Sequence, residues 1–132
     1  MDERDYVSFK TALGLKKAGF NYPCQYYYTK YDAPDGHVWC MTSEDAPIDY
    51  NKTIYAKCSM PALWQAQKWL RETKNLHISI IRNDCGYVYD ICKADNGTYI
   101  TDGIFYGPND GGQWDTYEEA LEVGIQEALK LV

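Results

Sequence analysis

The chain has 132 residues and a formal net charge of −6, and 45% of its residues are hydrophobic. This length suits one domain that folds without disulfides or a structural metal, and the composition excludes a disordered chain. The negative charge argues against the basic surface of a nucleic-acid-binding protein, and no apolar run approaches the roughly 20 residues of a membrane span. Residues 1–5 are too polar for a signal peptide, so we expect a cytoplasmic protein with no membrane partner.

The first half of the chain predicts one helix and a β-hairpin. Residues 8–18 carry an apolar stripe at helical spacing, with Ser8 as N-cap and Gly19 as the residue that ends the helix. Residues 25–30 and 37–41 are predicted strands, joined by a Pro- and Gly-containing turn at residues 32–36. The next segments are expected to be a polar loop at residues 42–52 and a short extended piece at residues 53–58.

The second half predicts a helix, a meander of strands and a final helix. The second helix is expected to begin at residues 59–61, with Pro61 in its first turn. Asn96 and Gly97 are typical of a two-residue type I′ turn between neighbouring strands. Thr116 is a suitable N-cap for the final helix. The predicted strands are residues 76–82, 87–93 and 98–101, with a possible fourth at 104–106, followed by a loop at 107–112 and the helix at 116–132.

These elements predict one α+β domain over residues 1–132. In it, a hairpin and a three- to four-strand meander form an antiparallel sheet that is packed by about three helices. The final helix is expected to place its apolar face on the meander. Gly124 lies in the middle of that face, where a glycine is unfavourable unless another group closely approaches the backbone. We therefore expect a strand or a large aromatic side chain against Gly124.

The sequence offers no pattern for catalysis or for a metal site. Five cysteines are scattered, odd in number and free of Cys-x-x-Cys spacing, which favours reduced thiols. His37 and Cys40 would point to opposite faces of a strand and chelate poorly. A small cysteine-dependent enzyme stays open as an alternative, with Cys85 and either His37 or His77 as its nucleophilic pair. We predict no catalytic residues, no metal and no cofactor.

The aromatic content is unusual, because 15% of the residues are aromatic and 13 of them are tyrosines. Tyrosine joins an apolar ring to a polar hydroxyl, and it suits both half-buried sheet faces and protein interfaces. Tyr26, Tyr28, Tyr31 and Trp39 are therefore predicted to form a partner-binding surface. The alternative is a tyrosine-rich face of a sheet with no partner.

Three segments of the chain carry a family resemblance. They are residues 6–20 (YVSFKTALGLKKAGF), residues 61–72 (PALWQAQKWLRE) and residues 116–132 (TYEEALEVGIQEALKLV). In this order they resemble a family of small uncharacterised proteins carried by phages, prophages and other mobile elements of gut anaerobes. The usual member has a bulkier residue where this chain has Gly14. The resemblance implies a mobile-element accessory protein and supplies no activity and no catalytic residues.

The sequence thus predicts a non-catalytic accessory or protein-binding protein of a phage or mobile element. A nucleic-acid-related role is the main alternative. In that case tyrosines stack on unpaired bases, or the acidic chain mimics DNA and occupies a DNA-binding protein. The net charge disfavours direct binding of nucleic acid, so a protein is the expected partner.

Overall fold

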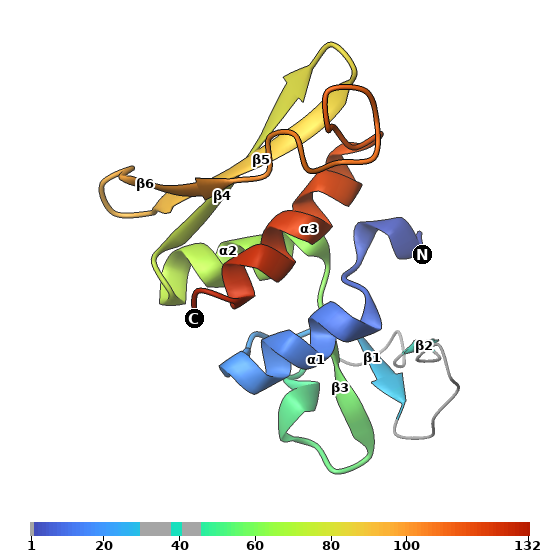
Figure 1. The fold of residues 1–132 in the computed structure, drawn as a ribbon. Coiled ribbons are helices and arrows are strands. Elements are labelled where there is room, and N and C mark those ends of the chain that lie inside the picture. The colour runs from blue at the N-terminus through green and yellow to red at the C-terminus, as the bar shows by residue number, and fades with distance from the viewer. Residues whose placement is uncertain (1, 30–37, 41–45) are drawn as a thin grey trace. The chain divides into compact units, whose positions relative to one another are not determined.

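The computed structural model describes residues 2–29 and 46–132, and the backbone of residues 38–40. Its contacts divide the chain into two compact units, residues 1–66 and 67–132. The division falls within helix α2, Leu63–Thr73, and not in the loop at residues 42–52 (Figure 1). Each unit contains an antiparallel three-stranded sheet. The α+β class is confirmed, with two sheets where the sequence predicted one, and the single domain stays a prediction.

The first unit consists of helix α1, Phe9–Ala18, and strands β1, Tyr26–Thr29, β2, Val38–Cys40, and β3, Ala56–Met60. The side chain of Ser8 accepts a hydrogen bond from the Thr11 N–H, and Gly19 ends the helix at a φ of 100°. The strand order is β2-β1-β3, so the predicted hairpin is confirmed and the extended piece after it becomes its third strand. Short 3-10 helices lie at Glu3–Asp5 and Tyr50–Lys52.

Two sequence predictions for this unit need correction. Helix α2 begins at Leu63 and not at residues 59–61, because Ser59 and Met60 pair with Tyr27 and Tyr26 of β1. The described part of the expected loop is also more regular than predicted. There Ile48 pairs with Cys24, and the segment ends in the second 3-10 helix.

The second unit is the predicted meander with the final helix packed on it. Strands β4, Leu76–Asn83, β5, Gly86–Lys93, and β6, Tyr99–Asp102, lie in the order β4-β5-β6. Helix α3, Tyr117–Leu129, crosses one face of this sheet and contacts β4 and β5 (Figure 1). Its buried residues are Ala120, Leu121, Gly124, Ile125 and Ala128. The Thr116 cap and the packing of this helix on the meander are both confirmed.

Two details of the meander differ from the prediction. The β5–β6 loop is longer than a two-residue type I′ turn, because the Gly97 N–H donates to the Lys93 carbonyl and the Lys93 N–H to the Thr98 carbonyl. Gly97 has a φ of 75°, but Asn96 keeps a negative φ and its side chain accepts from the Thr98 N–H. The fourth strand was wrong, since residues 104–106 lie in a turn and the sheet of this unit ends at β6.

Candidate partner-binding surface

The structure places Tyr28 in the core of the first unit, with 5% of its surface exposed. Its hydroxyl donates a 2.7 Å hydrogen bond to the Val7 carbonyl, and its ring packs edge-on against Phe9 with centroids 5.1 Å apart. Tyr26 points to the same side of β1, half-buried, and its ring lies 5.3 Å from that of Tyr6. The Tyr28 side chain is therefore part of the packing of this unit and is not presented to a partner.

The other two predicted contact residues are placed less fully. Trp39 pairs with Tyr27 through the backbone of β2, and its side chain lies outside the described residues. Tyr31 lies outside them altogether. The described residues do not join Tyr26, Tyr28, Tyr31 and Trp39 into one surface.

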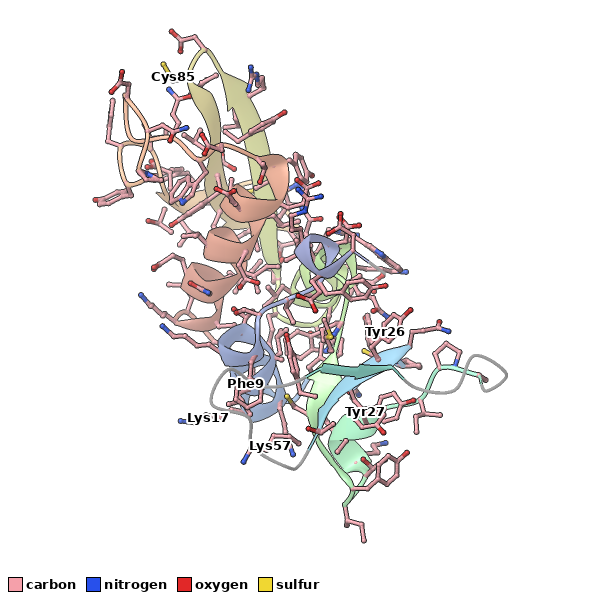
Figure 2. All side chains as sticks on the ribbon, turned by 90° about the vertical axis from the view of Figure 1, so that its right-hand side faces the viewer. Phe9, Lys17, Tyr26, Tyr27, Lys57 and Cys85 are labelled. Atoms are coloured by element: carbon pink, nitrogen blue, oxygen red, sulfur yellow. The ribbon has the colours of Figure 1, made fainter. Side chains whose placement is uncertain are left out.

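The opposite face of β1 carries a different group of aromatic residues. Side chains alternate along a strand, so Tyr27 leaves β1 on the side away from Tyr26 (Figure 2). Its ring centroid lies 4.6 Å from that of Tyr50 and 5.7 Å from that of Tyr55. Tyr50 is buried, whereas Tyr55 is 53% exposed and neighbouring Ile54 is 87% exposed. The alternation along residues 26–28 was the sequence signal for this second face.

The most exposed aromatic pair of the second unit lies in the loop after β6. Phe105 and Tyr106 are each 78% exposed, and Ile104 is 36% exposed. We name these three residues the aromatic tip. The sequence did not predict this surface, because the apolar residues 104–106 also suit a short fourth strand. Gly103 before it, and Gly107 and Pro108 after it, were the signal for a loop that presents an apolar segment.

The loop that bears the aromatic tip is anchored by hydrogen bonds. Its segments are joined by the Gly107 N–H, which donates to the Gly112 carbonyl at 2.7 Å, and by the Asn109 N–H, which donates to the Gln113 carbonyl at 2.9 Å. The loop also lies beside the β4–β5 turn (Figure 1), where the Cys85 N–H donates to the Gln113 side chain and Tyr87 pairs with Trp114. The tip is thus presented in a defined conformation.

Phe105 has a φ of 73°, in the left-handed region. A non-glycine residue in this region costs about 1–2 kcal/mol. The backbone of Gly112 lies against this residue, since a Cβ added at Gly112 would be 2.1 Å from the Phe105 Cα. Strained residues of this kind concentrate at functional sites. The observed strain therefore marks the tip as the leading candidate for a binding surface.

The segment of the sequence that contains the aromatic tip is acidic. Residues 94–129 contain eight Asp and Glu and no Lys or Arg. Asp90 on β5 lies directly opposite Asp102 on β6. The hydrogen bond that Tyr99 donates to Asp102 raises the pKa of Tyr99, and the charge of Asp90 and nearby Tyr106 act in the same direction. The tip and these carboxylates thus share one electrostatic environment.

Among the described residues, Cys85 and His77 do not form the nucleophilic pair considered for an enzyme. Cys85 is exposed at the end of the β4–β5 hairpin (Figure 2), whereas His77 lies near the start of β4 and opposite Cys92. His77 lies six residues before Asn83 at the turn, a span of about 20 Å along the strand. His37 lies outside the described residues. Burial raises the pKa of Cys24 and of Cys58 to about 12, so both are protonated thiols at neutral pH.

Within residues 2–29 and 46–132, no group of three or more His, Cys, Asp or Glu side chains is arranged to hold a metal ion. None of the helices in the described part of the chain combines the length and the apolar character needed to cross a bilayer.

Comparisons with known proteins add no assignment. No protein-family model, no curated protein and no solved structure matches the chain.

Proposed function

We propose that the chain is a non-catalytic accessory protein that binds another protein through the aromatic tip, in the service of a phage or mobile element. The observation that carries this proposal is the exposure of Phe105 and Tyr106 on an anchored, strained loop. Exposed aromatic side chains are typical anchors of protein interfaces. A loop that is already ordered loses little conformational entropy when it binds, which favours affinity.

The proposed partner surface differs from the one predicted from the sequence. Tyr28 is used by the core, and the tyrosines on the other face of β1 pack on one another. Phe105 and Tyr106 have no such internal use, because most of each side chain is in solvent. Their exposure therefore weighs more as a sign of binding than that of Tyr55.

Affinity capture with a matched control tests the proposal. The bait is the purified chain, the test variant is Phe105→Asn with Tyr106→Ser, and the control is Tyr55→Ser, which also removes an exposed aromatic ring. We expect proteins from a host extract that bind the wild type to fall about tenfold or more on the test variant, as for loss of an interface anchor, and to stay on the control. An identical captured set on all three baits would refute the proposal.

A further inference from the structure

The aromatic tip lies beside a pair of carboxylates whose arrangement costs stability. Asp90 and Asp102 are direct cross-strand partners, and like charges in such positions repel each other. Ser79 lies on the other side of Asp90, so the neighbouring strand supplies no positive charge there. Among the described residues, the ion pairs Arg4–Asp2 and Lys130–Glu127 both lie elsewhere and involve neither Asp90 nor Asp102.

One of the two carboxylates, that of Asp102, is connected to the aromatic tip by a hydrogen bond. Asp102 accepts a 3.0 Å hydrogen bond from the Ile104 N–H, the first residue of the tip. It also accepts from the hydroxyl of Tyr99, which is 62% exposed. Aromatic rings and carboxylates therefore lie within one small region at the end of β6.

We propose that this region binds a basic segment of a partner protein, in which an arginine or lysine lies next to an apolar residue. The proposal rests on the function proposed for the aromatic tip and adds the chemistry of its partner. A guanidinium group binds carboxylates through charge-assisted hydrogen bonds and also stacks on aromatic rings. The chain itself shows the second contact, since the Arg82 guanidinium lies 5.0 Å from the centre of the Tyr87 ring.

Charge selects a protein segment over a nucleic acid as the occupant. Exposed tyrosines and phenylalanines can stack on unpaired bases, but nucleic-acid-binding surfaces combine such rings with Lys and Arg for the phosphates. Here Asp102 binds the first residue of the tip and lies opposite Asp90, and the sequence supplies no Lys or Arg between residues 94 and 129. A phosphate backbone would be repelled, whereas a basic peptide would be attracted.

The test uses a phage-displayed library of random 12-residue peptides, selected on the purified chain. Peptides that also bind the variant Phe105→Asn with Tyr106→Ser are removed. We expect the remaining peptides to contain Arg and Lys at about twice their frequency in the library or more, next to an apolar residue. Peptides that depend on the tip but lack a basic bias would refute this inference and leave the proposed function standing. Recovery of no tip-dependent peptide would count against both.

A binding measurement on the best synthetic peptide then tests the carboxylates. In 50 mM NaCl, we expect Asp90→Asn with Asp102→Asn to raise the Kd about tenfold or more, and the difference to shrink at 500 mM NaCl because salt screens the charges. Asparagine keeps an acceptor oxygen for the Ile104 N–H, so the loop should keep its conformation, which circular dichroism and thermal melts check.

The matched control is Glu3→Gln with Asp5→Asn, two exposed carboxylates in the first unit. It removes the same charge and is expected to change the Kd less than about twofold, as is usual for remote surface charges. Equal effects of the two double variants would show that only the net charge matters. Binding of a fluorescent oligo-dT strand that is lost in Phe105→Asn would overturn the choice of a protein segment.

Discussion

Gly124 is the residue at which the packing of α3 is most sensitive to one added group. It lies in the middle of α3, and a Cβ built on it would be 2.9 Å from Cγ2 of Ile78 and 3.3 Å from Cγ of Tyr89. Both neighbours are buried, on β4 and β5 respectively. The expectation that a strand or a large aromatic side chain lies against this glycine is therefore confirmed.

Two opposing terms set the effect of replacing Gly124. Carbon atoms pack best about 3.5–4.0 Å apart, so the methyl group of alanine would force a shift of roughly 0.6 Å against the branched Ile78 side chain. Overpacking of this kind costs about 1–3 kcal/mol, whereas the gain in helix propensity from Gly to Ala is about 1 kcal/mol. We expect Gly124→Ala to be destabilised by about 0–2 kcal/mol, and Gly124→Leu by more, about 1–3 kcal/mol net.

Urea denaturation followed by circular dichroism measures these changes. Leu121→Ala, which leaves a cavity on the same face, should cost about 2–5 kcal/mol, and Glu122→Gln on the polar face less than about 0.5 kcal/mol. Ile78→Leu removes the Cγ2 branch, so Gly124→Ala should cost at least about 0.5 kcal/mol less in that background. An unchanged midpoint for Gly124→Leu would refute the described packing of α3 on β4 and β5.

Four other features of the chain should also affect its stability. Tyr28→Phe should lower the free energy of unfolding by about 1 kcal/mol in thermal melts, because a buried carbonyl loses its donor. Burial raises the pKa of Cys24 and Cys58 from 9.0 to about 12, so the folded chain holds these two protons more tightly than the unfolded chain. This contribution to the free energy of unfolding is complete below pH 9 and is lost as the pH rises from 9 to 12. In urea melts over this pH range, the free energy of unfolding should fall by up to about 1.4 kcal/mol per pH unit for each thiol. Cys58→Ala should remove the part of this pH dependence that comes from Cys58. Phe105→Asn should raise stability by up to about 1 kcal/mol, since asparagine tolerates the left-handed region. Asp90→Asn should raise it by about 0.2–1 kcal/mol by removing the repulsion across the strands, and thermal melts check both.

Local chemistry made the secondary structure predictable. Ser8 and Thr116 cap their helices as expected, because a side-chain oxygen reaches the N–H groups of the first turn whatever the rest of the fold does. The errors occurred where long-range pairing decides the structure. Ser59 and Met60 look like a helix start, but pairing with β1 keeps them extended. Nothing local encodes that choice, because the partner strand lies about 30 residues earlier in the chain.

The candidate site was predicted less well because residue type does not fix exposure. Tyr26, Tyr27 and Tyr28 look alike in the sequence, yet one hydroxyl binds a core carbonyl and the neighbouring ring packs on the opposite face. The apolar run at residues 104–106 could be a strand or a loop by composition alone. The left-handed φ of Phe105 and the hydrogen bond from the Tyr106 N–H to the Gly103 carbonyl make a turn there, and both become visible only in three dimensions.

Stability distinguishes the two exposed aromatic surfaces. Tyr55 contacts Tyr27 and the buried Tyr50, so packing alone accounts for its position, and Tyr55→Ser should destabilise the chain. At the end of β6 three features act against stability, namely the left-handed Phe105, the exposed rings and the opposed carboxylates of Asp90 and Asp102. Folding gains nothing from that combination, whereas binding of a basic, apolar segment would use every part of it. A variant at residue 105 that has a higher melting temperature and binds less would show that Phe105 costs stability and serves binding. A variant with a lower melting temperature would place Phe105 among the packing residues.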